Sequence, residues 1–487
     1  MKIFIKLLKD MMRIILYYTI KKSINKNMSS KYFELYKKNI KNKDIAWQYL
    51  CQSFTYDSSN RELFIQIYNK LNSNFFDNKK NLLRIYLCHN IFDLVYFFKY
   101  CCLFIKKNKF LNNIKVEYSP SKNNDFEKEL IDNSINWLLT CQKNSLDRGI
   151  CTAYDLVEKK LTISFPETTG YIIPTLLEYS KLKQNDKIYN ISKEMGEWII
   201  DITRDDGGLG EAYGFYRPGP RIFTTAQAII GLLSLYLASN NRKFLNTAVK
   251  MGEFLTQNLN KDGSWNKNFT FLKITTTYKS RVSWILMMLY DVTNEIKFKE
   301  ASLKSLQYII NNKTKNYWPE SCNFDKSNNA LTHLLGYHLV AIVKFAYYEK
   351  LEDLNLKKEL IDHCSFFYKR IQKQLSTAND LKGIINDKFE KVVDYNCLTG
   401  SAQIMYFALI YEKKNSINKN LISEILYKSL YDKQISNNQK EVNGSISGSF
   451  PINGEYMPNM LPAWASKFFI DSLLYRKKER IDYTFLG

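Results

Sequence analysis

Residues that break or cross-link a chain are scarce in this 487-residue sequence. Its 18 glycines and 9 prolines exclude a collagen-like or linker-rich chain and argue against a turn-dense β-sandwich. The nine cysteines include no Cys-x-x-Cys pair, and there are only four histidines. An odd number of cysteines without a secretory signal indicates reduced thiols, and so few histidines argue against a structural zinc site.

Common catalytic and cofactor motifs are absent too. The sequence has no Gly-x-x-x-x-Gly-Lys-Ser/Thr phosphate loop, no Gly-x-Gly-x-x-Gly after a predicted strand and no His-Glu-x-x-His. It also lacks the aspartate-rich motif expected of a terpene cyclase. We therefore expect neither a metal nor a cofactor.

We predict no transmembrane segment in this sequence. The run 87–105 contains His89, Asp93 and Lys99, so we predict a buried or interfacial helix there. The opening segment 1–18 alternates apolar clusters with cations, and no small-residue cleavage site follows it. It predicts a basic amphipathic helix that either lies on an anionic membrane surface or packs against a domain.

Positive charge is concentrated at the start of the chain. The sequence has 70 Lys and Arg against 48 Asp and Glu, a net charge of +22, and residues 1–115 hold 22 of the basic and 7 of the acidic side chains. The rest is nearly balanced, unlike a nucleic-acid-binding surface, so no nucleic acid is expected as a partner. We predict a basic helical extension over 1–115 and a separate domain over 116–487.

From residue 116 onward the sequence predicts helix after helix. Apolar residues recur at i, i+3, i+4 and i+7 in stretches separated by loops that hold Gly, Asp, Asn or Pro. The twelve predicted helices are 126–142, 170–182, 188–202, 224–238, 243–258, 278–294, 299–311, 331–348, 354–374, 398–413, 418–433 and 461–476.

These helices form six hairpins. Alternate helices end in similar phrases about every 55 to 60 residues, and some are followed by Asp-Gly or Gly-Gly turns that suit a helix C-cap. Six hairpins either remain an open solenoid or close into an (α/α)6 toroid. We predict the all-α closed toroid, with the loops after its inner helices lining a central funnel.

Five phrases in order resemble a known group: PETTGYI at 166–172, SRVSW at 280–284, LTHLLGY at 331–337, CLTGSAQ at 397–403 and WASKFF at 464–469. Over about 125–475 the chain resembles an uncharacterised bacterial family of α/α-toroid proteins encoded among surface-polysaccharide assembly genes. Their barrel is similar to those of six-hairpin glycosidases and terpenoid cyclases. Some members carry the label δ-aminolevulinic acid dehydratase, which requires a βα-alternating barrel and does not suit this sequence.

The resemblance implies carbohydrate chemistry without naming a reaction. Where relatives often read Asp-Thr-Gly-Gln, this chain has TTAQ at 224–227, which puts the role of that acid in doubt.

Glycoside hydrolysis uses two carboxyl groups that face each other across a sugar, and neighbouring loops offer candidates. Glu167 follows a proline and opens a predicted helix, where the helix dipole favours a carboxylate. Asp155 lies in the loop before it, and Asp206 lies in the next loop. The alternatives are that Glu167 is a first-turn cap and that Asp206 belongs to a helix terminator.

A second constellation suits proton transfer at a sugar carbon. Arg281 with Tyr278, and His333 with Tyr337, begin two later predicted helices. β-Elimination or C5 epimerisation needs an arginine to hold a uronate carboxylate and a tyrosine or histidine to move the C5 proton. The alternatives are an arginine tethered to a loop acid and a structural histidine.

Other polar and aromatic residues complete the expected funnel lining. The predicted substrate-binding residues are Tyr154, Tyr171, Gln227, Tyr337, Gln403, Trp464 and Lys467. Cys397 precedes a predicted helix start, where the pKa of a thiol can fall, although packing at the turn is the favoured interpretation.

The sequence therefore predicts a carbohydrate-active protein of surface-polysaccharide assembly, either a glycoside hydrolase-like or a polysaccharide lyase- or epimerase-like enzyme. Its expected partners are a saccharide or lipid-linked oligosaccharide and an anionic membrane surface. Its expected location is the cytoplasm, peripheral at the inner face of the membrane. The alternative is a non-catalytic glycan-binding or scaffold protein.

Overall fold

The computed structural model describes residues 126–477, apart from 146, 211–218, 266–275, 313–317, 320–321, 325–326, 379 and 437–438. The predicted basic extension over 1–115 and the predicted helix over 87–105 lie outside the described residues. The chain divides into two compact units, one formed by 1–114 with 210–220 and one by 115–209 with 221–487. The helices and strands that the structure describes all belong to the second unit.

The part of the chain that the structure describes contains twelve α-helices, at the places predicted, so the all-α fold class is confirmed. The outer helices are α6 (Phe126–Lys143), α8 (Asp186–Ile202), α10 (Arg242–Gln257), α12 (Ile296–Asn311), α14 (Leu354–Ala378) and α16 (Ile422–Leu430). The inner helices are α7 (Pro166–Lys183), α9 (Ile222–Ser239), α11 (Ser280–Thr293), α13 (Thr332–Ala346), α15 (Leu398–Lys414) and α17 (Ala463–Lys477).

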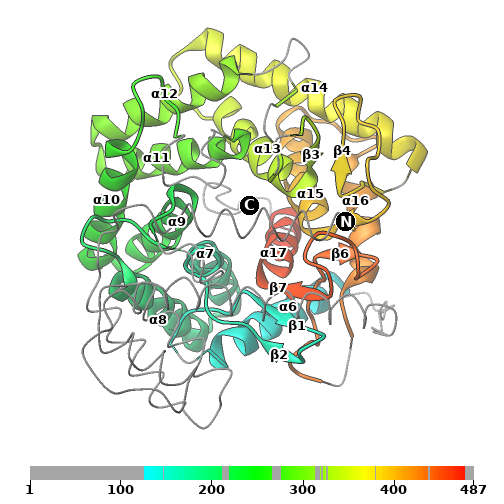
Figure 1. The fold of residues 1–487 in the computed structure, drawn as a ribbon, viewed down its shortest axis with the longest axis horizontal. Helices are drawn as coiled ribbons and strands as arrows, with labels where there is room; N and C mark the ends of the chain where they lie inside the picture. Colours follow the sequence, from blue (N-terminus) through cyan, green and yellow to red (C-terminus); the bar gives the residue numbers. More distant parts are fainter. Residues whose placement is uncertain are drawn as a thin grey trace, which may run out of the picture. The chain divides into compact units, whose positions relative to one another are not determined.

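The hairpins close into a ring. Each inner helix packs against the next, and the last inner helix, α17, packs against both α6 and α7 at the start of the ring (Figure 1). The described unit is therefore an (α/α)6 toroid and not an open solenoid.

Burial explains why the chain forms two layers of helices. The outer helix α8 buries Ile188, Met195, Trp198, Ile199 and Ile202, which recur every three or four residues along one face. The inner helix α13 is buried along its whole length. It packs against α11, α14 and α15, and its remaining face is turned toward the ring axis.

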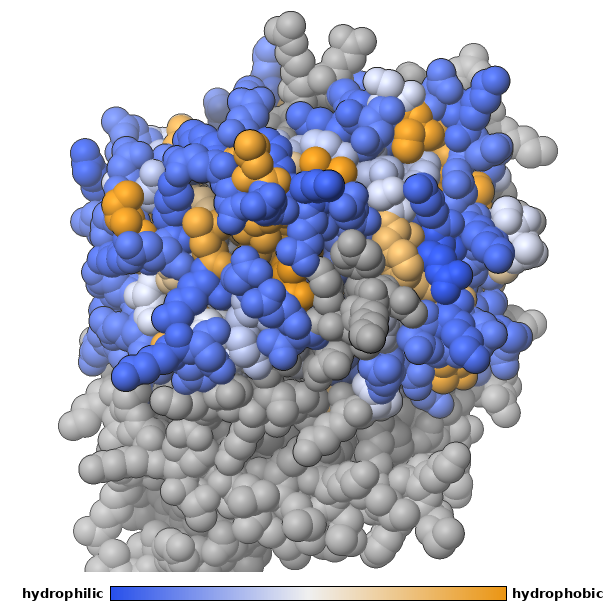
Figure 2. Space-filling view, turned by 90° about the horizontal axis from the view of Figure 1, so that it is seen from above, coloured by the Kyte–Doolittle hydropathy of each residue, from blue (hydrophilic) through white to orange (hydrophobic). Residues whose placement is uncertain are grey.

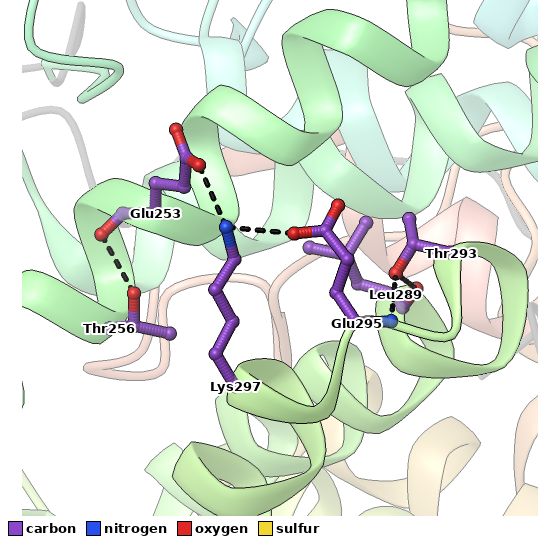
Figure 3. Close-up of polar contacts among 6 residues, drawn as sticks. All are labelled: Glu253, Thr256, Leu289, Thr293, Glu295 and Lys297. Atoms are coloured by element: carbon purple, nitrogen blue, oxygen red, sulfur yellow. Dashed lines mark hydrogen bonds and ion pairs between the residues drawn. The ribbon is translucent and has the colours of Figure 1, made fainter.

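The outward faces of the outer layer are polar. On the face drawn in Figure 2, apolar side chains lie in small groups among more numerous hydrophilic ones. In the outer layer the Lys297 ammonium of α12 lies 2.8 Å from the carboxylates of Glu253, on α10, and of Glu295 (Figure 3).

Among the residues that the structure describes, one helix is long and apolar enough to cross a membrane. The helix α9 contains an 18-residue apolar window, but 72% of that window is buried inside the ring. Such burial is typical of a core helix.

The connections differ at the two ends of the ring. Inner helices are joined to the next outer helix by short connections, such as 184–185 and 240–241, that begin with Gln184 and Asn240 in the left-handed conformation. The long loops follow the outer helices and lead to the first turns of the inner helices. Our expectation that the lining loops follow the inner helices was wrong, because helical periodicity does not show which end of a hairpin carries the longer loop.

Short β-strands lie in these long loops. They are β1 (Ala153–Asp155), β2 (Lys160–Leu161), β3 (Ala330–Leu331), β4 (Ile384–Ile385), β5 (Asn396–Cys397), β6 (Ser449–Phe450) and β7 (Met460–Pro462). They pair antiparallel in the orders β2-β1-β7, β3-β4 and β5-β6. The strands β3, β5 and β7 each lead directly to the first residue of an inner helix, which fixes where α13, α15 and α17 begin.

The Asp-Gly turns pack one hairpin against the next instead of capping helices. The C-cap residues of α8 and α10 are Thr203 and Asn258, a few residues before Gly207 and Gly263, whose φ values are +85° and +91°. A Cβ at either glycine would lie 2.4 Å from a backbone oxygen of the following outer helix. Glycine is therefore required at both turns for its φ value and for its small size.

Candidate active site

The first turns of the inner helices place two layers of side chains at one end of the ring. The second residues of these helices are Glu167, Phe223, Arg281, His333, Thr399 and Trp464. The sixth residues, one helical turn deeper on the same face, are Tyr171, Gln227, Ile285, Tyr337, Gln403 and Phe468. We call these sets the upper layer and the lower layer.

Contacts between helices that are not neighbours show that these side chains point to the ring axis. The Arg281 guanidinium of α11 lies 5.9 Å from the ring centre of Phe468 on α17, at the opposite side of the ring. The rings of Phe223, on α9, and Tyr337, on α13, are 5.1 Å apart. Such contacts can only be made across the axis.

Arg281 is the central cation of the upper layer. It is 3% exposed, its Nε–H donates to Oε1 of Gln227 at 2.7 Å, and its guanidinium lies 5.1 Å from the Tyr337 ring centre. Burial lowers the pKa of Arg281 from its ordinary value, although an arginine remains charged near neutral pH. A buried cation here stabilises negative charge that forms near the axis.

His333 is the titratable neighbour of Arg281. Its Nδ1 lies 2.8 Å from Oε1 of Gln403, and because an amide oxygen only accepts hydrogen bonds, Nδ1–H donates and Nε2 carries no proton. Burial lowers the pKa of His333 to about 4; the Gln403 bond opposes that shift and nearby Arg281 adds to it. The imidazole is therefore neutral at pH 7, with Nε2 available as a base.

Glu167 is the carboxylate of the upper layer. It is the second residue of α7 and accepts a hydrogen bond of 3.3 Å from Thr224 Oγ1. Burial raises the pKa of Tyr337 across the axis, and the charge of Glu167 adds to that shift. Only Glu167 and Phe223 among the upper-layer residues are half-buried, and the other four are buried. Solvent therefore reaches this layer beside α7 and α9.

The lower layer contains two buried amide groups with incomplete hydrogen bonding. The amide nitrogens of Gln227 and Gln403 have no hydrogen-bond partner among the described residues, although both side chains are at most 1% exposed. Buried donors of this kind call for a partner, which water or a ligand on the axis can supply.

A buried ion pair lies beside this site, where the last inner helix, α17, packs against the first, α7. Lys467 Nζ and Asp471 Oδ2, both on α17, are 2.6 Å apart with both side chains fully buried, and Thr175 Oγ1 of α7 donates to Asp471 Oδ1 at 2.6 Å. Burial lowers the pKa of Lys467 to about 8, while Asp471 opposes the shift. Lys467 is thus held between α17 and α7, with its Nζ 5.5 Å from the ring centre of Tyr171 and 4.1 Å from that of Phe468, and its role in substrate binding stays a prediction.

The structure brings most of the predicted site residues together. Glu167, Arg281, His333, Tyr337, Tyr171, Gln227, Gln403 and Trp464 lie in the two layers. Tyr278 precedes α11, and its ring lies 4.9 Å from that of Phe223.

Three predicted residues lie in the loops. Asp155 Oδ1 accepts hydrogen bonds from the backbone N–H groups of 157 and 158, and Asp206 Oδ1 accepts from Gly208 N–H and from Arg204. Tyr154 lies in β1, where burial and the charge of Glu441 raise its pKa. Both acids therefore stabilise turns where they lie, and their pairing with Glu167 stays a prediction.

The sequence analysis missed three aromatic residues of the site. Phe223 and Phe468 occupy the same helical positions as predicted residues, so the spacing from each helix start could have identified them. Tyr456 comes from the loop between β6 and β7; its ring is 5.4 Å from that of His333, and its hydroxyl accepts from Trp464 Nε1 at 2.9 Å. No periodic signal marks such a loop residue.

The thiol of Cys397 is not activated. Burial raises its pKa to about 12, so the lowered pKa considered for this helix start is wrong. The five cysteines in the described ranges are free and buried, and those ranges contain no group of three or more His, Cys, Asp or Glu that could hold a metal ion.

No protein-family model matches the sequence, and no curated protein is similar to it in sequence. Solved structures are similar in fold. An unsaturated glucuronyl hydrolase specific for heparin is 13% identical, with 72% of this chain and 97% of that chain covered at a TM-score of 0.57. A cellobiose 2-epimerase from Bacillus thermoamylovorans is 12% identical, with 73% and 99% covered at a TM-score of 0.58. A family 88 glycosyl hydrolase from Bacteroides vulgatus is 13% identical, with 72% and 98% covered at 0.52.

At these identities the likeness shows the fold alone: an α/α toroid of the kind found in sugar hydrolases and epimerases. The link to surface-polysaccharide assembly stays a prediction.

Proposed function

We propose that this chain is a carbohydrate-active enzyme whose site is the upper layer, and that its chemistry is proton transfer at a sugar carbon, as in epimerisation or β-elimination. The observation that supports this proposal is the state of His333: a buried imidazole, neutral at pH 7, with its tautomer fixed by Gln403 and a guanidinium beside it. An imidazole that is unprotonated at pH 7 can accept a proton, and the guanidinium beside it favours the negative charge that the transfer creates on the substrate.

In this mechanism His333 Nε2 takes the proton from the carbon next to a carboxylate or carbonyl group. The negative charge then develops on that group, where Arg281 stabilises it without having to reorient, because Gln227 and Tyr337 already hold the guanidinium. Glu167, on the opposite side of the axis and open to solvent, exchanges a proton on the other face of the sugar.

Hydrolysis is the second candidate, favoured by the position of Glu167 at the first turn of α7. It requires a further carboxylate across the sugar. The upper layer contains one acid, and Asp155 and Asp206 stabilise turns, so proton transfer is the better supported reaction.

The cellular setting is proposed from the sequence. The five-phrase resemblance and the basic opening segment support a glycan or lipid-linked oligosaccharide of surface-polysaccharide assembly as the substrate. They also support a cytoplasmic protein that is peripheral at the inner face of the membrane.

The test is to incubate the protein with acidic and neutral glycans in D2O and, separately, in water labelled with oxygen-18. Epimerisation incorporates carbon-bound deuterium, elimination gives the ultraviolet absorbance of an unsaturated uronate, and hydrolysis incorporates labelled oxygen. We expect His333→Asn to lower turnover about 10²- to 10⁴-fold. Glu253→Gln, on the outer helix α10, removes a carboxylate far from the axis and is expected to leave turnover unchanged.

Two results would contradict the proposal. Labelled oxygen in the product, with turnover lost in Glu167→Gln and kept in His333→Asn, would establish the hydrolase instead. Measurable glycan binding without any product would favour the scaffold alternative.

A further inference from the structure

A groove on the outside of the toroid lies between two outer helices, α14 and α16. Its volume is about 730 Å3, and one of its walls is the connection between α15 and α16. Its lining consists of Lys369, Gln372, Lys373, Ser376, Asn418, Asn420, Leu421, Glu424, Ile425 and Lys428. None of these residues lies on an inner helix, so the groove is separate from the site on the ring axis.

The net charge of the groove is positive. Lys369, Lys373 and Lys428 form no ion pair with any described residue. The single acid, Glu424, has its Oε1 2.8 Å from Arg476 on α17, which it shares with Glu127, so three lysines outweigh one partly compensated carboxylate. Elsewhere in the outer layer a lysine such as Lys297 is held between two carboxylates (Figure 3). The groove ammonium groups therefore remain available to an anion.

The groove is also built to accept hydroxyl groups. Gln372, Ser376, Asn418 and Asn420 bring amides and a hydroxyl to its walls, while Leu421 and Ile425 supply apolar surface. Gln372 Nε2 donates to the Asn420 backbone oxygen at 2.8 Å, which joins α14 to the connecting loop and holds the two walls together. A sugar residue presents hydroxyl groups at its edges and C–H groups on its face, and this lining matches both.

The spacing of the lysines suits a chain of charges better than a single ion. Lys369 and Lys373 are four residues apart on α14, which places their Cβ atoms about 5 to 6 Å apart on one face of the helix. Lys428 faces them from α16. Ammonium groups distributed along and across the groove fit a polymer that carries an acidic group on successive sugar residues.

We propose that this groove binds a segment of an acidic polysaccharide, at a site distinct from the ring axis. The lysines hold the carboxylate or sulfate groups, and the amides hold the hydroxyl groups. The groove thus retains the polymer on the outside of the toroid. This inference goes beyond the proposed reaction and does not require it, because retention of the polymer needs no turnover.

The experiment measures binding of an oligogalacturonate by calorimetry to the full chain, with a neutral cello-oligosaccharide of equal length as the comparison ligand. We expect the acidic ligand alone to bind, with an affinity that falls as ionic strength rises. Replacing Lys369, Lys373 and Lys428 together by glutamate is expected to weaken binding at least about tenfold. The triple glutamine variant is expected to weaken binding less.

A matched control makes the same change of net charge on the surface outside the groove. Lys187, Lys243 and Lys358 are exposed on α8, α10 and α14, outside the groove, and their joint replacement by glutamate is expected to change affinity less than about twofold. His333→Asn is expected to keep full binding, which separates this inference from the proposed reaction. Urea unfolding midpoints show that each variant is folded.

Three results would overturn the proposal. The first is an equal loss of affinity in the two triple glutamate variants. The second is no binding of oligogalacturonate by the wild-type chain. The third is full competition for the groove by inorganic phosphate or a single-stranded oligonucleotide at matched charge. The last result would identify a general anion site without preference for a saccharide.

Discussion

Replacement of Asp471 by asparagine tests whether the buried ion pair stabilises the closure of the ring. Asp471 and Lys467 are both fully buried, and Thr175 on α7 donates to the same carboxylate. In Asp471→Asn the buried Lys467 loses its counter-charge, so the folded chain must either keep an uncompensated charge or release the proton of Lys467. Removing one partner of a buried pair costs about 3 to 5 kcal/mol. We expect a loss of this size in the free energy of unfolding at pH 7.

The pH dependence of this loss identifies its cause. Burial already lowers the pKa of Lys467 to about 8 in the presence of Asp471, so the pKa falls further without it. The folded variant then holds Lys467 neutral, whereas the unfolded chain keeps it charged up to about pH 10.4. The folded variant binds fewer protons, so its stability rises with pH by about 1.4 kcal/mol per unit across that range. The loss relative to wild type should therefore be smaller at pH 9 than at pH 7.

The assay is urea unfolding followed by tryptophan fluorescence at the two pH values. Lys467→Met combined with Asp471→Leu removes both charges and is expected to recover most of the loss, since apolar side chains replace buried pairs at little cost. Glu253→Gln removes the acid of an exposed pair, whose side chains are 43% and 44% exposed, and should change stability by less than about 1 kcal/mol. A loss below about 1 kcal/mol in Asp471→Asn, or a double variant no more stable than the single one, would refute this reasoning.

Two further predictions concern histidines. Burial lowers the pKa of His333 to about 4 and of His338 to about 3, so below about pH 6.5 the folded chain binds fewer protons than the unfolded chain. Stability should therefore fall by about 1.4 kcal/mol per pH unit for each histidine until the pH reaches its folded pKa, or about 4 kcal/mol in total at pH 5. His338→Gln should halve the slope measured by urea unfolding between pH 7 and 5, and an unchanged slope would contradict the assignment. In Gln403→Glu a carboxylate replaces the amide that faces His333 Nδ1, so the pKa of His333 should rise above about 4. Nitrogen-15 NMR titration measures it, and a pKa that stays at about 4 would show that residue 403 does not contact the ring in solution.

Local periodicity was sufficient to predict the helices, and the count of six hairpins favoured the closed ring over an open solenoid. The first turns of α7, α11 and α13 carried Glu167, Arg281 and His333 in phrases that stood out in the sequence, and these residues do meet at the axis. Counting from the predicted helix starts would have added Phe223 and Phe468. The predicted start of α7 fell four residues late, because Pro166 was not treated as the first helical residue, a position that proline favours.

Long-range geometry could not be predicted in the same way. Thr175 and Asp471 are 296 residues apart in the chain, and only closure of the ring brings them together. Tyr456 reaches His333 from a loop whose path is set by pairing of β5 with β6 and of β1 with β7. Asp155 and Asp206 look like catalytic acids in sequence, because a carboxylate that caps a turn and one that faces a sugar occur in the same kinds of loop.

The hydrogen bonds that Arg281 and His333 make with glutamines favour a catalytic role over glycan binding alone. These two residues lie on neighbouring inner helices, and glutamines from the helices on either side, α9 and α15, each accept a hydrogen bond from one of them. This arrangement fixes the guanidinium and the imidazole tautomer, which a proton transfer needs and which a binding surface does not. It also leaves two buried amide NH2 groups without partners among the described residues, and each such group costs about 1 to 3 kcal/mol unless water or a ligand bonds to it. A polar ligand on the axis that displaces water can bond to both amide groups while the fixed guanidinium and imidazole face it.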